Sequence, residues 1–262
     1  GEAGAIHAAL AAQIIELAEQ ADPSDPGKMV ARLTREQANI RAALAWALGD
    51  TGHGGDPATA LRLAAALWPF WHMRGQYQEG HGWLERAIAQ AGQVDPETRA
   101  QAFLTLANIA NNLEDHAHAR SLYEESLRLS EEIHSERGVA SALIGLGMVA
   151  TNTGDYDRAG VLLDRALERC RAAGAPGILA CLYGLGQLAV ARGDYDEAER
   201  RFEETRQACG PEHSGVLAYL AMEEARIARY RGDLLAAPEL IGVCLRQFRD
   251  MVERRAEAVS LA

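Results

Sequence analysis

The chain has 262 residues, of which 48% are apolar, and a formal net charge of −11. Such a charge repels a phosphate backbone and argues against direct nucleic-acid binding by this segment. The sequence holds neither an apolar run long enough to span a bilayer nor a basic-then-apolar signal segment, so we predict a cytoplasmic protein without membrane contact.

The first 56 residues predict a divergent helix pair. Residues 3–20 are expected to form its first helix, residues 22–27 a loop, and residues 36–46 its second helix. Residues 49–56 are rich in glycine and aspartate, and Pro57 suits the first turn of the next helix.

A short turn phrase then returns five times, every 39 or 40 residues, mostly as Gly-Asp followed by an aromatic or apolar residue. The phrases begin at Gly75, Glu114, Gly154, Gly193 and Gly232. A fixed period in this range indicates a stacked repeat protein. We therefore predict five repeats over residues 57–250, each a pair of helices that we call helix A and helix B.

Small residues flank each turn at constant distances. They are Ala107, Gly147, Gly186 and Ala225 before the turns, and Gly80, Ala119, Ala159, Ala198 and Ala237 after them. Small side chains let two helices cross closely, with larger apolar groups beside them. Trp68 departs from this pattern, and Pro69 should kink its helix. A generic alanine-rich bundle is the alternative, but it would not keep phase over five units.

This spacing resembles the tetratricopeptide repeat. The predicted fold is therefore all-α, a right-handed superhelical solenoid of about six helix pairs that forms one array over residues 1–262. Residues 251–262 are expected to form a terminal helix or cap.

Catalytic and metal-binding patterns are scarce. Gly27-Lys28 lacks the glycine spacing and the following Ser or Thr of a phosphate loop. His116 and His118 are two residues apart, so they should point in different directions on a helix. His81 stands alone and is expected to be a packed or surface residue. We predict no enzyme activity, no cofactor and no metal.

The N-terminal third narrows the family. Residues 39–44 (Asn-Ile-Arg-Ala-Ala-Leu) and the later Trp83-Leu84-Glu85 resemble the start of the repeat array in bacterial signal-transduction NTPase regulators of the LuxR and antibiotic-regulatory types. The resemblance implies a regulatory sensor arm, flanked in such proteins by NTPase and DNA-binding domains. Neither a phosphate loop nor a helix-turn-helix is evident here, so an excised or free-standing arm is expected.

Helix A lines the concave groove in this repeat type, which gives a set of candidate binding residues. One group offers amides for a peptide backbone or polar small molecule: Asn108, Asn111, Asn112 and Asn152. The other combines aromatic rings and guanidinium groups: Tyr183, Tyr219, Arg226, Arg229 and Tyr230. Alternatively, these residues only solvate an open groove, and the arginines pair with Glu223 or Glu224.

Three functions remain open from the sequence. The first is a regulatory module of a transcriptional regulator that binds a protein, a peptide or a small-molecule effector in the groove. The second is a free-standing adaptor that binds a partner peptide. An enzyme is third, because no nucleophile, base and orienting group converge.

Overall fold

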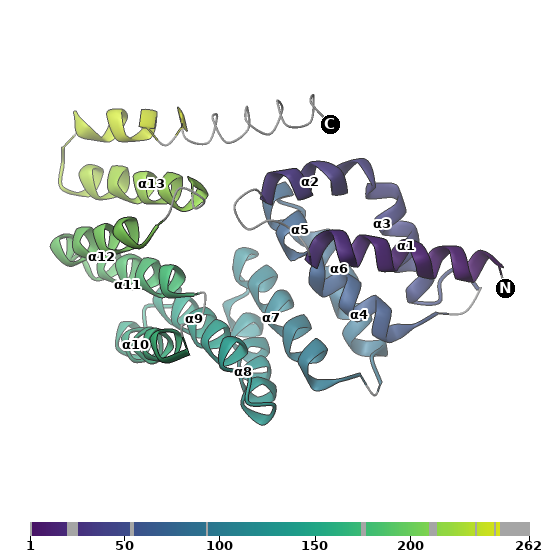
Figure 1. Cartoon of the computed structure of the whole chain (residues 1–262). Coiled ribbons are helices and arrows are strands. Elements are labelled where there is room, and N and C mark those ends of the chain that lie inside the picture. Colours follow the sequence, from purple (N-terminus) through teal and green to yellow (C-terminus); the bar gives the residue numbers. More distant parts are fainter. Residues whose placement is uncertain are drawn as a thin grey trace. The chain divides into compact units, whose positions relative to one another are not determined.

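The computed structural model describes residues 2–19, 26–52, 55–92, 94–173, 177–209, 214–233, 235–243 and 245–246. These residues form helices and no strand, as predicted (Figure 1). None of these helices combines the length and apolar character needed to cross a bilayer. The chain divides into two compact units, the first made of residues 1–22 and 29–145 and the second of residues 23–28 and 146–262.

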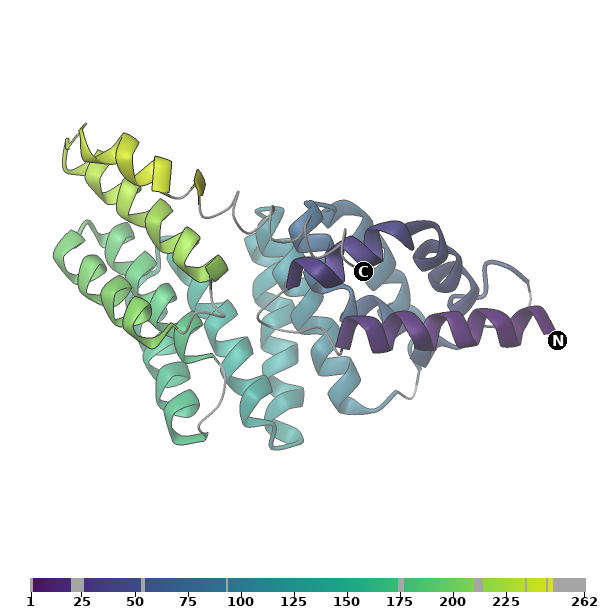
Figure 2. The same cartoon turned by 45° about the horizontal axis from the view of Figure 1, so that its top comes forward.

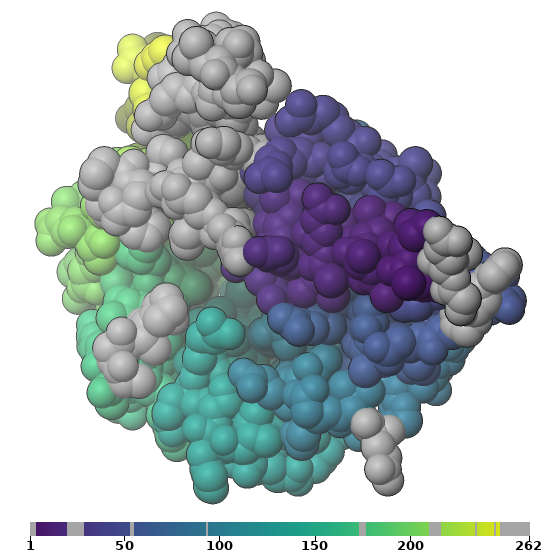
Figure 3. Space-filling model, turned by 45° about the vertical axis from the view of Figure 1, so that its right-hand side comes forward, coloured from purple at the N-terminus to yellow at the C-terminus, as the bar shows by residue number. Residues whose placement is uncertain are grey.

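The first unit begins with a divergent helix pair. Helix α1 (Glu2–Glu19) packs against α3 (Gln37–Ala47) and α4 (Pro57–Ala66). In the space-filling view α1 lies on the surface between the α2–α3 segment and α4 (Figure 3). The sequence missed α2 (Pro26–Arg35), which ends where Glu36 takes a non-helical ψ of 9° before α3 begins.

The remaining helices of the first unit are α5 (Trp68–Arg74), α6 (Tyr77–Gln90), α7 (Pro96–Asn112) and α8 (His116–Glu132). Helix α4 packs on α6 and α7, and α7 packs on both α6 and α8. The predicted kink is confirmed: helix A of this repeat is split into α4 and α5 at Leu67, with Pro69 in the first turn of α5.

Helix α9 (Glu136–Asn152) runs from the first unit into the second. The second unit continues with α10 (Tyr156–Ala173), α11 (Ile178–Arg192), α12 (Tyr195–Ala208) and α13 (Ser214–Tyr230), followed by further helical residues at 236–243. Helix α11 packs on α10 and α12, and α12 packs on α13. Figures 1 and 2 show α11, α12 and α13 in successive layers.

Each turn phrase ends one helix and starts the next. The first residue of all five phrases has a left-handed φ, between 63° and 82°, which ends helix A. The residue after it then donates a main-chain hydrogen bond to the carbonyl oxygen five residues earlier in helix A, as from Asp194 N to Ala189 O at 2.9 Å. The Asp194 carboxylate also caps helix B by accepting from Glu197 N at 3.1 Å. The Gly-Asp phrase is thus a C-cap and an N-cap in succession.

The small positions beside the turns hold close helix crossings, as predicted. A Cβ on Gly147 would lie 2.7 Å from Leu163 Cγ, and one on Gly80 would lie 2.6 Å from the Trp71 ring. A Cβ on Gly186 would overlap the Phe202 ring in the same way. These pairs link helix A of a repeat to helix B, so the spacing read from the sequence corresponds to real side-chain packing.

The tryptophans of the first unit take different partners. Trp71 is 1% exposed and belongs to the core, whereas Trp68 is half-buried and stacks on His72 at 4.8 Å between ring centroids. Trp46 stacks on His7. The predicted terminal helix at residues 251–262 lies outside the described residues, and the handedness of the array stays a prediction.

Candidate functional site

A cleft of about 530 Å³ opens in the second unit along one side of α9, α11 and α13. Its lining comes from equivalent positions of three successive helices A and from the start of α12: Met148, Thr151, Asn152, Gly184, Gln187, Val190, Ala191, Arg192, Gly193, Tyr195, Arg226 and Tyr230. Eight of these residues stand two, three or six positions before Gly154, Gly193 or Gly232, as the predicted groove residues Asn152, Arg229 and Arg226 do. The turn glycines therefore predicted which side of each helix A faces the cleft.

A buried carboxylate lies directly behind the cleft. Glu223 on α13 is 2% exposed, and its Oε1 accepts a hydrogen bond from the Tyr183 hydroxyl at 2.9 Å and one from Gln187 Nε2 at 3.1 Å. Burial, followed by the charge of Glu223, raises the pKa of Tyr183, so the phenol stays protonated and remains a donor. This network links α11 to α13 at the base of the cleft.

Arg226 lines the cleft and completes this network. Its Nη2 lies 2.5 Å from Glu223 Oε2, one helical turn earlier on α13. The sequence left open whether Arg226 would bind an external anion or pair with a neighbouring carboxylate, and in this structure it pairs with Glu223. A side chain held by a buried acid is fixed in direction, so Arg226 presents a defined donor surface instead of a mobile charge.

Aromatic rings and guanidinium groups form one edge of the cleft. The rings of Tyr195 and Tyr230 stack with centroids 5.9 Å apart and an interplanar angle of 20°. The guanidinium carbon of Arg229 lies 5.5 Å from the centroid of Tyr230, and that of Arg231 lies 6.0 Å from the centroid of Tyr195. Stacked tyrosines flanked by arginines are a composition typical of binding hot spots.

The predicted aromatic and guanidinium residues take different places in this site. Arg226 and Tyr230 line the cleft, and Tyr183 lies beneath it in the Glu223 network. Arg229 reaches the edge through its contact with Tyr230. Tyr219 is 42% exposed on α13 and is not part of the lining. Four of the five predicted residues are therefore divided between the wall, the base and the rim, and Tyr219 is not among them.

The predicted asparagines are divided between the two units. Asn152 lines the cleft of the second unit, whereas Asn108, Asn111 and Asn112 lie on α7 in the first unit. There, Asn108 Oδ1 accepts from the Tyr123 hydroxyl at 2.6 Å, and Asn112 Nδ2 donates to the main-chain oxygen of Asn108 at 2.8 Å. These two amides are engaged within α7 and α8, which weakens their assignment to a ligand.

Apart from two glycines, two lining residues were missed by the sequence reasoning. Tyr195 and Arg192 flank the Gly193–Asp194 turn, outside the positions that the helix A phase assigns. Arg192 Nη2 donates to the main-chain oxygen of Tyr156 at 2.8 Å, so it braces one turn against the next. The available signal was the tyrosine that follows the turn at Tyr77, Tyr156 and Tyr195.

A second cleft, of about 1140 Å³, lies in the first unit among α1, α4, α5 and α7. Trp68 and Pro69 line it beside the kink, and Arg62 on its wall is paired with Glu19 of α1 through two bonds of 2.9 and 2.6 Å. This cleft is larger, but among the described residues no buried charged side chain lies behind it. We therefore place the candidate site in the second unit.

Comparisons with known proteins agree with this architecture. Two family profiles described as tetratricopeptide repeat match residues 99–137 and residues 138–210. Among curated proteins, none matches the sequence significantly.

Several solved structures share the fold. A Rap protein complexed with competence and sporulation factor superposes with a TM-score of 0.69 at 13% identity, covering 97% of this chain and 78% of that one. BtubC (BKLC) from P. vanneervenii gives a TM-score of 0.59 at 20% identity, covering 84% and 92%. The Rap conjugation gene regulator of plasmid pLS20 with the Phr* peptide gives 0.62 at 13% identity, covering 74% and 55%.

At these identities the likeness shows the fold and no more. The superposed structures also cover residues on either side of 99–210, and those residues share the helix-pair architecture. The chain is accordingly an all-α solenoid, in which residues 99–210 consist of tetratricopeptide repeats.

Proposed function

We propose that the chain is a non-catalytic binding module and that its second-unit cleft holds an extended segment of a partner protein or peptide. The observation that carries this proposal is the cleft wall itself. Three consecutive helices A contribute equivalent positions, so polar and apolar groups recur along the wall at the spacing of the repeat. A regular wall of this kind suits an extended chain better than a compact metabolite.

The network beneath the wall supports the same proposal. Tyr183, Gln187 and Glu223 hold Arg226 in one direction, and Tyr195 stiffens Tyr230 by stacking. Ordering these side chains in advance lowers the entropy lost on binding. Rigid aromatic and guanidinium groups then contribute most where partner side chains cover them from water.

Two of the similar solved structures favour a peptide as the occupant. One Rap regulator is described in complex with the Phr* peptide, and another Rap protein is described as complexed with competence and sporulation factor. A free-standing adaptor that holds a partner protein remains the alternative use of the same cleft, and a small-molecule effector is the third candidate occupant.

The regulator context is a further part of this proposal. Residues 39–44 and Trp83-Leu84-Glu85 resemble the start of the sensor arm in LuxR-type and antibiotic-regulatory NTPase regulators. We infer that the chain is such an arm in the cytoplasm of a bacterium, and that DNA contact belongs to other domains. The net charge of −11 supports the last point because it opposes phosphate binding.

Selection from a library of random peptides tests the binding proposal. Selected peptides are titrated against the wild type and against Tyr230→Ala, which removes a cleft-wall ring that is 52% exposed and leaves the Glu223 network intact. We expect the affinity to fall at least about tenfold, as for a central interface residue.

The double variant Asn111→Ala/Asn112→Ala in the first unit is the matched control, and its affinity should equal that of the wild type. Unchanged binding by Tyr230→Ala, together with a loss in the asparagine variant, would move the site to the first unit.

A further inference from the structure

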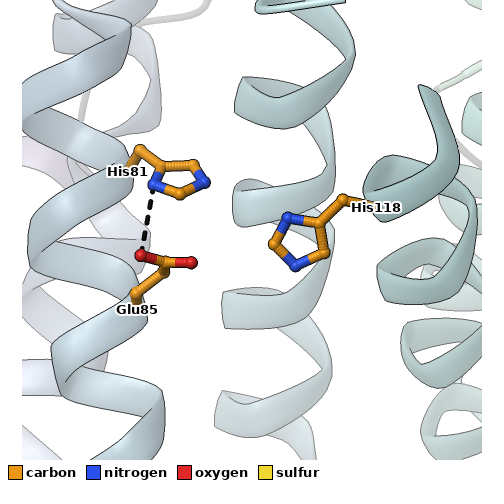
Figure 4. Close-up of side chains that lie close together, drawn as sticks. All are labelled: His81, Glu85 and His118. Atoms are coloured by element: carbon orange, nitrogen blue, oxygen red, sulfur yellow. Dashed lines mark ion pairs between the residues drawn. The ribbon is translucent and has the colours of Figure 1, made fainter. Parts of the chain in front are cut away.

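Three potential metal ligands from two helices converge in the first unit, and none of them lines either cleft. His81 and Glu85 lie on α6, and His118 lies on α8. One donor atom from each of the three side chains lies within 4.8 Å of the other two. Figure 4 shows His81 and Glu85 pointing from α6 toward His118, which points back from α8 into the same space.

The helix register explains why two of the three ligands share a direction. His81 and Glu85 are four residues apart, so they lie on one face of α6, and His81 Nδ1 lies 3.4 Å from Glu85 Oε2. The His81 side chain is 24% exposed and that of Glu85 is 50% exposed. Both groups are therefore accessible to an ion from solvent and can adjust their rotamers.

The third ligand comes from the following repeat. The rings of His81 and His118 meet edge to face, with centroids 6.0 Å apart and an interplanar angle of 72°. His116, two residues earlier on α8, points elsewhere, and its Nδ1 lies 3.1 Å from Asn111 Oδ1. His118, and not His116, is therefore the histidine of α8 that is directed toward α6. The ion pair between His81 and Glu85 does not involve His118, so that pair does not explain the direction of the His118 side chain.

We propose that His81, Glu85 and His118 bind a divalent transition-metal ion, Zn²⁺ in the first instance. Two imidazole nitrogens and one carboxylate oxygen form a ligand set that zinc accepts, with a fourth position open to water. In a tetrahedral site with bonds near 2.0–2.1 Å, ligand atoms lie about 3.3 Å apart. Side-chain rotation on binding would bring the donor atoms, which lie within 4.8 Å of one another, to this spacing.

Such a site would couple two successive repeats. The ion would join helix B of one repeat to helix B of the next, on either side of α7, which already packs on both. Metal binding would then stabilise the first unit, because a ligand that binds only the folded chain shifts unfolding to higher temperature. The proposal replaces the expectation, drawn from the sequence, that the chain binds no metal.

Isothermal titration of the metal-free, tag-free protein with Zn²⁺ tests the proposal. We expect the wild type to bind one equivalent, and His81→Ala, His118→Ala and Glu85→Gln each to weaken binding more than about tenfold. His116→Ala is the matched control on the same helix and should bind zinc as the wild type does. Circular dichroism verifies that each variant keeps its helices.

Two independent readouts accompany the titration. Co²⁺ bound by three protein ligands and water should give the visible absorption of a four-coordinate ion, which His118→Ala should lose. Zinc should raise the Tm of the wild type and of His116→Ala, and leave that of His118→Ala unchanged. The proposal is overturned if zinc does not bind, or if His81→Ala and His118→Ala bind it with wild-type affinity.

Discussion

Arg226 and Glu223 lie one turn apart on α13, with Arg226 Nη2 at 2.5 Å from the Oε2 of a carboxylate that is almost fully buried. The pair joins a partly exposed cation to an acid that cannot reach water. Removing the cation alone would leave the acid with its neutral donors, Tyr183 and Gln187. A substitution of Arg226 should therefore change the stability of the second unit as well as the surface of the cleft.

Arg226→Ala should lower the free energy of unfolding by about 1–3 kcal/mol, less than a fully buried pair because the arginine is partly exposed. The double variant Glu223→Gln/Arg226→Met removes both charges at similar volume and should recover much of this loss. Urea unfolding followed by circular dichroism measures both. A double variant that is less stable than Arg226→Ala would contradict the account. Because Arg226→Ala changes stability as well as the cleft wall, Tyr230→Ala is the better variant for measuring binding.

Gly186→Ala should destabilise the chain by about 1–3 kcal/mol, because its new Cβ would overlap the Phe202 ring at a helix crossing. Gly160→Ala is the matched control on a neighbouring helix. Its Cβ would meet only ordinary contacts at 3.7 Å, so the better helix propensity of alanine should stabilise it by up to about 1 kcal/mol. Thermal unfolding of the two variants should shift Tm in opposite directions. Equal shifts in Tm would mean that the two helices do not cross closely at residue 186.

Glu114→Gly should stabilise the chain by about 1 kcal/mol. Glu114 is the one turn residue of the five that is not glycine, and it holds a φ of 63°, which costs a side-chain-bearing residue energy. The reverse change, Gly154→Ala at a φ of 82°, should cost a similar amount. Chemical unfolding midpoints compare the two, and a destabilised Glu114→Gly would point to an unrecognised role of the Glu114 side chain.

Acid should weaken the first unit through His72. Burial lowers the pKa of His72 in the folded chain below its usual 6.5, and its Nδ1 lies 3.0 Å from the Tyr77 hydroxyl. The unfolded chain therefore binds a proton first, so stability is full above about pH 6.5 and falls as the pH drops toward the lowered pKa. His72→Gln should show a smaller loss between about pH 7.5 and pH 5.5 in urea unfolding. An identical pH dependence in both proteins would assign the effect to other groups.

Trp71→Ala should cost about 3–5 kcal/mol, because Trp71 is 1% exposed in the core. Trp68→Ala should cost clearly less, since Trp68 is half-buried on the wall of the first-unit cleft. Differential scanning calorimetry ranks the two. The sequence could not rank them, because they lie three residues apart on one short helix, α5, and the packing around that helix buries Trp71 more than Trp68.

The sequence predicted those features of the fold that recur with the period of the repeat. Turn glycines, cap aspartates and small crossing residues recur at fixed distances, so the helix boundaries and the inner face follow from the spacing. It could not predict Glu223 as a buried acid, because its partner Tyr183 lies 40 residues earlier, in the preceding repeat. The same limit hid the convergence of His81 and His118, which only the stacking of α6, α7 and α8 creates.

The Gly-Asp turn allows a whole repeat to be removed or added without changing the residues of the turn. Excising residues 155–193 would join Gly154 to Asp194, which rebuilds the same phrase with its left-handed glycine and capping carboxylate intact. Adding a copy of the same segment would preserve the phrase equally well. The length of a groove built this way can change by whole repeats without any new turn chemistry, so its reach along a partner comes in discrete steps set by the period.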